Sequence, residues 1–148
     1  METLTLPIEK EKTIRIYNPK INYKSSADVK ILRIEFNDEY TIIDFLYSSS
    51  TKYENGGWVQ ISKYTFIRVV GTKKKLRLIK AENIPIAPKK HFFKVPKEML
   101  AYTLYFPALP KGCEKIDIIE SESGAKNLFN FYGVSMYKIS KKIRFCIN

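Results

Sequence analysis

The chain has 148 residues, of which 45% are hydrophobic, 14% aromatic and 28% charged, and its formal net charge is +11 at pH 7. This composition excludes disordered and fibrous classes, and the length is typical of one domain, so we expect a single domain over residues 1–148. No apolar run approaches the roughly 20 residues that a membrane-spanning helix requires. A protein this basic attracts anionic partners, and nucleic acid is the first class to consider.

The first twenty residues lack the apolar core of an export signal, because charges from Glu9 to Lys12 interrupt it. Two alternatives for localisation follow. Either the protein stays in the cytoplasm, or a leader has been removed and the protein acts in the periplasm or at the cell envelope.

Apolar and polar residues alternate along the chain, and no window shows a helical stripe over several turns. Short alternating runs separated by turn residues are typical of sandwiches, so the sequence predicts an all-β, antiparallel β-sandwich of roughly 7–10 strands. The expected strands are residues 13–17, 29–36, 40–47, 58–62, 65–70, 76–80, 102–106, 116–120 and 131–137, with an edge strand at 143–147.

The connections also favour antiparallel pairing. The polar link at 37–39 predicts a β-hairpin, and residues 71–75 predict another with Lys73, Lys74 and Lys75 at its tip. The stretch 83–96 contains three prolines, too many for a central strand, so we expect a long crossover from one sheet to the other.

Alternation also assigns the two faces of each strand. In the strand 102–106 the residues Tyr102, Leu104 and Phe106 should face the core, with Thr103 and Tyr105 outward. The same rule gives further core candidates: Ile43, Phe45, Val59, Ile61, Leu76, Leu78, Ile116 and Ile118.

The residues that usually carry chemistry are few. His91 is the only histidine, and Cys113 and Cys146 lack CxxC spacing, so no transition-metal or cofactor site is expected. The two cysteines are either free thiols or, in an oxidising compartment, a disulfide. No nucleophile or phosphate-binding motif occurs. The sequence therefore predicts a noncatalytic protein.

Three carboxylates near one strand end resemble a glycosidase acid and base. However, alternation places Asp117 outward, and Glu120 and Glu122 end the strand. We therefore expect all three to solvate an edge or to pair with nearby lysines.

Aromatic residues among positive charges can stack unpaired bases, although the same spacing is typical of cross-strand packing. Trp58 follows two glycines, and an indole there can either contact a sugar or a partner protein or pack across the sandwich. The aromatic candidates are Tyr40, Tyr47, Tyr53, Trp58, Tyr64 and Phe66. The proposed contact residues are Tyr53, Trp58 and Tyr64, with Lys73, Lys74 and Lys75.

A series of local motifs follows in order along residues 17–134: YNP at 17–19, TIIDF at 41–45, GGWVQIS at 56–62, LRLIKAENIPI at 76–86, YTLYFPALPKG at 102–112, KIDIIES at 115–121 and FNFYGV at 129–134. In this order they resemble the immunoglobulin-like β-sandwich domain of exported bacterial proteins, of the kind found N-terminal to thioredoxin-like (AhpC/TSA-type) domains. The resemblance implies an immunoglobulin-like fold.

The same resemblance implies an accessory or interaction module at the cell envelope, with no catalytic residue. The cysteine pair that follows IIE in many relatives is replaced here by SESGAK at 121–126, so a redox role is not expected. The predicted function is a noncatalytic binding or interaction module with an unknown protein or glycan partner. The alternative is a basic nucleic-acid-binding domain, which requires lysine clusters and aromatics to converge on one face.

Overall fold

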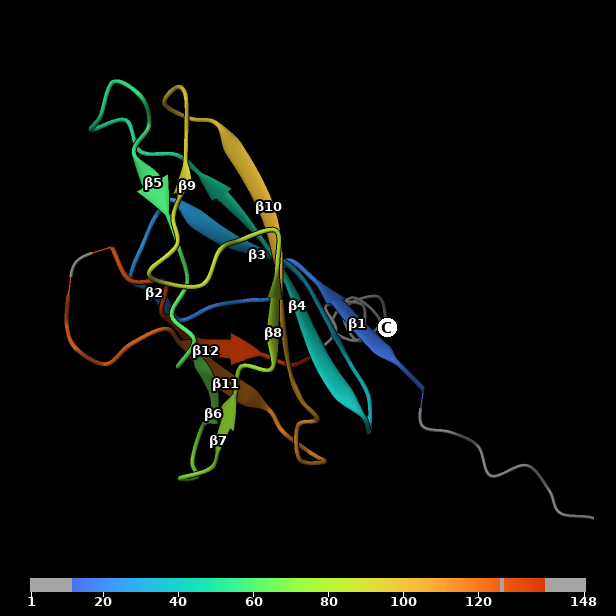
Figure 1. The fold of residues 1–148 in the computed structure, drawn as a ribbon. Helices are drawn as coiled ribbons and strands as arrows, with labels where there is room; N and C mark the ends of the chain where they lie inside the picture. The colour runs from blue at the N-terminus through green and yellow to red at the C-terminus, as the bar shows by residue number, and fades with distance from the viewer. Residues whose placement is uncertain (1–11, 126, 138–148) are drawn as a thin grey trace, which may run out of the picture.

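The structure, a computed structural model, describes residues 12–125 and 127–137. All the regular secondary structure in these ranges is β-strand, which confirms the expected all-β fold (Figure 1). The described residues contain no helix long and apolar enough to span a membrane. The edge strand expected at 143–147 and Cys146 lie outside the described residues.

The strands form two five-stranded sheets and one small sheet, and all paired strands run antiparallel. The first sheet has the order β1 (Ile14–Tyr17), β3 (Val29–Phe36), β4 (Tyr40–Ser48), β10 (Met99–Pro107) and β8 (Lys80–Glu82). The second has the order β2 (Tyr23–Lys24), β12 (Phe131–Ser135), β11 (Lys115–Ile119), β6 (Phe66–Val69) and β7 (Lys75–Arg77). The small sheet pairs β5 (Trp58–Val59) with β9 (His91–Phe92).

The alternation in β4 and β10 determines which face of the first sheet is buried. In the observed register Ile43 is opposite Leu104 and Phe45 is opposite Tyr102, and all four side chains are buried. Phe106 is also buried, so the core face predicted for residues 102–106 is confirmed. Successive strand residues point to opposite faces, which is why their neighbours remain accessible to solvent.

The two large sheets pack their apolar faces against each other around one core. The ring centroid of Phe45 in β4 lies 5.6 Å from that of Phe131 in β12. The predicted core residues Ile43, Phe45, Val59, Ile61, Leu76, Ile116 and Ile118 are buried, and Leu78 is partly buried against the core. A sandwich-like arrangement of antiparallel sheets results.

The predicted strand at 76–80 is wrong, because the chain changes sheets within it. Its first part lies in β7 of the second sheet and its last residue begins β8 of the first sheet. Leu78 N donates to Thr65 O at 2.8 Å, and the next amide, Ile79 N, donates to Tyr105 O, also at 2.8 Å. Adjacent amides thus bond toward different sheets.

The predicted crossover at 83–96 is also wrong, because the chain changes sheets before this segment begins. Since β8 and β10 neighbour each other in the first sheet, the segment between them leaves and re-enters one sheet. On its way it contributes β9 to the small sheet, which lies near the top of Figure 1. The sheet change had already occurred before Lys80.

Both predicted hairpins are confirmed. The turn between β3 and β4 is stabilised by Asn37, whose Oδ1 atom accepts the backbone N–H groups of Glu39 and Tyr40 at 2.8 and 3.0 Å. This is the local side-chain to backbone bonding that favours asparagine in turns. The second hairpin joins β6 to β7 and carries exposed Lys73 and Lys74 at its tip.

Candidate functional site

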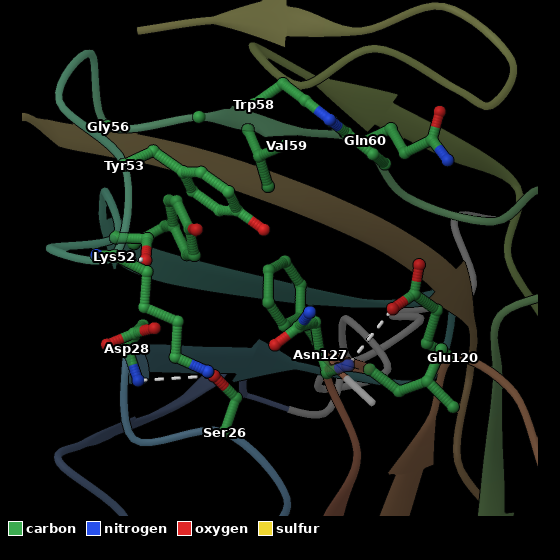
Figure 2. A pocket seen from close by; sticks show the side chains of 15 residues that line it. Ser26, Asp28, Lys52, Tyr53, Gly56, Trp58, Val59, Gln60, Glu120 and Asn127 are labelled. Carbon is green, nitrogen blue, oxygen red and sulfur yellow. Dashed lines mark hydrogen bonds between the residues drawn. The ribbon is translucent and has the colours of Figure 1, made fainter. Parts of the chain in front are cut away.

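A cavity of about 440 Å³ lies between loops at the end of the molecule that carries β5 (Figure 2). Its wall comes from residues 26–28, from the loop 50–57 with the following residues of β5, and from residues 127–129. The polar groups on the wall are those of Ser26, Asp28, Ser50, Lys52, Gln60, Glu120 and Asn127, and the aromatic ones those of Tyr47, Tyr53, Trp58 and Phe129. A volume of this size is typical of small-molecule sites.

The glycine pair before Trp58 shapes one side of the cavity. Gly56 has φ of +82°, and a Cβ atom there would overlap the carbonyl oxygen of Val95. Gly57 has φ of +72°, and a Cβ atom would lie 3.1 Å from Cδ2 of Tyr53. Only glycine adopts this conformation without strain and permits such close approach. The pair therefore allows the loop to pack on residue 95 and the Tyr53 ring to lie against the backbone.

Two aromatic side chains of this loop are accessible to solvent. The Tyr53 side chain is 58% exposed and points into the cavity in Figure 2, with Glu120 at the other side. Trp58 is 46% exposed and is opposite Phe92 in the small sheet, which is 65% exposed. Lys90 Nζ lies 4.3 Å from the centroid of the Trp58 ring, in cation–π geometry.

Glu120 is buried in the cavity wall, so the expectation that it solvates an edge or pairs with lysines is wrong. Its Oε1 atom accepts the N–H of Phe129 and its Oε2 atom accepts the N–H of Ser62, each at 3.0 Å. Burial raises the pKa of the Glu120 carboxyl above its ordinary value, against the opposing effect of these two hydrogen bonds. The carboxylate joins the loop at 129 to the segment after β5.

Asp117 is also buried, so the expectation that it solvates an edge is wrong, although it lies on the face opposite the core residues Ile116 and Ile118, as alternation predicts. Its Oδ1 atom accepts the N–H of Gly133 at 2.8 Å, and its Oδ2 atom lies 3.1 Å from both Nε and Nη2 of Arg68. β11 pairs with β6 without a register shift, and Asp117 is opposite Arg68 in that pair, so the arginine covers the carboxylate. Glu122 is exposed and pairs with Arg68 and Lys75 at 3.5 and 3.6 Å, as expected.

These bonds assign structural roles to the carboxylates that resembled a glycosidase pair. Asp117 binds a backbone amide and an arginine, and Glu120 binds two backbone amides. Asp117 is not among the residues of the cavity wall. Of these three carboxylates only Glu120 lies on the cavity wall, so they do not form an acid and a base that face one substrate.

The structure separates the predicted contact residues into two groups. Tyr53 and Trp58 meet at the cavity, whereas Tyr64 is exposed before β6, with Lys63 Nζ 5.0 Å from its ring centroid. Lys75 Nζ lies 4.7 Å from the centroid of Phe66. The β6–β7 hairpin with Lys73, Lys74 and Lys75 lies at the bottom of Figure 1, at the opposite end from β5.

The other aromatic candidates have structural contacts. Tyr40 donates its hydroxyl to Glu35 Oε2 at 3.0 Å, and Tyr47 and Phe66 are buried. Tyr47 packs against Phe93 and Phe129, with centroid distances of 5.6 and 5.3 Å. Burial, and to a lesser degree the Asp28 carboxylate, raises the pKa of the Tyr47 hydroxyl.

Sequence reasoning missed Asp28, Lys52 and Phe129, which line the cavity from three separate segments. No local pattern could reveal them, because their proximity depends on how the loops pack. It also missed that Lys90 and Phe92 flank Trp58, although the lysines at 89–90 are a visible basic cluster.

The histidine and the cysteine that the structure describes have unremarkable surroundings. His91 lies edge-on to Phe93, with a centroid distance of 4.9 Å. Cys113 is partly buried, which raises the pKa of its thiol. Within residues 12–125 and 127–137, no three His, Cys, Asp or Glu side chains come together as a metal site.

Comparison of the chain with protein-family models, with curated proteins and with solved structures finds no match. The proposed function therefore depends on the geometry of the cavity.

Proposed function

We propose that the domain is a noncatalytic binding module and that its ligand occupies the cavity beside β5. One observation supports this above all others: Tyr53 and Trp58, both substantially exposed, meet at a cavity of about 440 Å³ whose wall also carries hydrogen-bonding groups. Exposed aromatic rings beside convergent polar groups are characteristic of binding sites, because the rings contribute contact area and the polar groups contribute orientation.

The proposal that the module is noncatalytic is supported by the contacts of Glu120 and His91. Both oxygens of Glu120 accept backbone amides, and His91 packs on Phe93 outside the cavity wall. These hydrogen bonds fix the Glu120 carboxylate as part of the wall, which favours a structural role over that of a general base.

The family assignment is part of the same proposal. The ordered motifs from residue 17 to residue 134 support an immunoglobulin-like domain of exported bacterial proteins, acting at the cell envelope on a protein or glycan partner. The paired five-stranded antiparallel sheets are compatible with this assignment. A resemblance in fold does not identify a ligand, so the proposed binding site depends on the geometry of the cavity.

The alternative of a nucleic-acid-binding domain receives less support. It requires the lysine clusters and the aromatics to converge on one face. Lys90 lies over Trp58, but the larger cluster of Lys73, Lys74 and Lys75 lies at the opposite end of the molecule from β5 (Figure 1). The net charge of +11 remains as a source of nonspecific attraction.

Two tyrosines of similar exposure provide a matched test. Tyr53 is 58% exposed at the cavity and Tyr64 is 62% exposed away from it. A library of small polar and aromatic fragments, screened by ¹⁵N chemical-shift mapping on the full chain, should give hits whose shifts cluster at residues 26–28, 50–60 and 127–129. Tyr53→Ala should abolish these shifts and Tyr64→Ala should retain them. Hits that map elsewhere, or that survive Tyr53→Ala unchanged, would refute the proposal.

A further inference from the structure

We propose that the cavity binds a neutral, hydroxyl-rich ligand, namely a saccharide, which packs one ring face on Tyr53. This inference rests on the proposed function and specifies its ligand class. Three independent properties of the wall lead to it: the balance of charge, the hydrogen-bonding capacity and the available aromatic surface.

The charges on the wall favour an uncharged ligand. Asp28 and Glu120 contribute carboxylates, and Lys52 contributes one ammonium group. An anion such as a phosphate would meet the carboxylates, and a quaternary or primary amine would meet the lysine. Like charges at close range raise the free energy of binding, so a neutral ligand avoids both costs.

The hydrogen-bonding groups suit a ligand that both donates and accepts. Ser26 Oγ accepts the N–H of Asp28 at 3.2 Å, and Ser50 Oγ accepts the N–H of Lys52 at 3.0 Å. A hydroxyl that accepts in this way still has its own proton to donate. Each of these two serines can therefore donate to a ligand oxygen.

Acceptors are also present on the wall. The carboxylate of Asp28 lies on the wall and accepts hydrogen bonds. A carboxylate oxygen has more than one lone-pair site, so the carboxylate of Glu120 can accept further hydrogen bonds beyond its two amide partners. Sugar hydroxyls each donate one proton and accept others, which matches a wall of mixed donors and acceptors.

The aromatic surface is provided by Tyr53 rather than by Trp58. Lys90 lies over the Trp58 ring at 4.3 Å from its centroid, so one face of the indole is covered. The Tyr53 ring lies close to Gly57 on one side and is 58% exposed. A rigid, half-exposed ring at the mouth of a polar cavity can contact the apolar face of a pyranose and leave its hydroxyls to the wall.

The test uses saturation-transfer difference NMR on the full chain with glucose, N-acetylglucosamine, maltose, cellobiose and choline as probes. Inorganic phosphate has no carbon-bound proton, so its binding is followed by ¹⁵N chemical-shift mapping on the protein. We expect saturation transfer to the ring protons of at least one saccharide and none to choline. Tyr53→Ala should weaken the saccharide affinity at least about tenfold, equivalent to about 1.4 kcal/mol. Tyr64→Ala should leave it unchanged.

The possible outcomes separate this inference from the proposed function. Binding of choline or phosphate at the cavity, without saccharide binding, would overturn the saccharide proposal. Fragment binding that depends on Tyr53, with no saccharide bound, would do the same while the binding function stands. If neither fragments nor saccharides bind at the cavity, both proposals fail. Circular dichroism of each variant establishes that it is folded.

Discussion

Glu120 accepts the backbone N–H of Phe129 at 3.0 Å from within the buried wall of the cavity, and its second carboxylate oxygen accepts the N–H of Ser62. Burial nevertheless raises the pKa of the carboxyl above its ordinary value. The native state therefore holds this proton more firmly than the unfolded state, in which a glutamate titrates at about 4.3.

The first prediction is a pH dependence of stability. Below the pKa of Glu120 in the unfolded state, the carboxyl is protonated in both the folded and the unfolded protein. As the pH rises from there through the higher pKa of the folded state, the contribution of Glu120 to the free energy of unfolding decreases. The difference in unfolding free energy between the wild type and Glu120→Gln, measured with urea, should therefore decrease over this window. A ¹³C titration midpoint for Glu120 below the ordinary value would contradict the prediction.

The second prediction concerns the register of β10. Leu104→Ala should lower the free energy of unfolding by about 2–5 kcal/mol, because the fully buried side chain leaves a cavity in the core. Thr103→Ala should cost about 0.5–1.5 kcal/mol, since it removes only the 2.7 Å hydrogen bond to Asp44 Oδ1 on the outer face. Chemical denaturation measures both, and equal losses would mean that the faces are misassigned.

The third prediction compares two glycines with similar backbone conformations. Gly56 and Gly71 have φ of +82° and +87°, but a Cβ atom at Gly56 would overlap the Val95 carbonyl oxygen, whereas none of the surrounding atoms lies within 4 Å at Gly71. Gly71→Ala should cost only the backbone strain, about 1–3 kcal/mol. Gly56→Ala should cost clearly more in thermal unfolding, and it should weaken any ligand bound at the cavity. Similar costs would show that packing on residue 95 is unimportant.

The fourth prediction concerns nucleic acid. Binding of a fluorescent single-stranded oligonucleotide should be weak and should fall steeply with salt, with a log–log slope of about −0.7 for each phosphate contacted. Since Trp58 lies far from the hairpin lysines, Trp58→Ala should leave this binding unchanged, whereas replacing Lys73 and Lys74 with alanine should reduce it. Submicromolar affinity at physiological salt that depends on Trp58 would instead favour base stacking and the nucleic-acid function.

Much of the sheet structure could be predicted from the sequence, because a strand with one buried face has apolar residues at every second position. β4 and β10 are such strands, and their core residues were identified correctly. β11 is central in the second sheet, and its predicted core residues Ile116 and Ile118 are buried, but Asp117 between them is buried as well. Its burial was not predicted, because it depends on Arg68 of β6 and the amide of Gly133 in β12, which the sequence of β11 does not reveal.

The candidate site was only partly predictable. The two glycines followed by Trp58 correctly indicated the loop that lines the cavity, and the structure shows that these glycines allow the loop to pack closely. Lys52 and Asp28 come from loops whose proximity depends on tertiary packing, so their spacing in the sequence carries no signal. Lys73 and Lys74 were placed correctly at a hairpin tip, whereas Lys75 is the first residue of β7 and the cation beside the indole is Lys90.

The change of sheet between β7 and β8 affects how the molecule can come apart. Leu78 and Ile79 are adjacent, yet their amides bond to Thr65 beside the second sheet and to Tyr105 within the first. The two sheets are therefore tied to consecutive peptide units, with no intervening linker. Movement of one sheet relative to the other must be accommodated by rotation at Leu78 or by loss of one of these two hydrogen bonds, which couples the two halves of the sandwich.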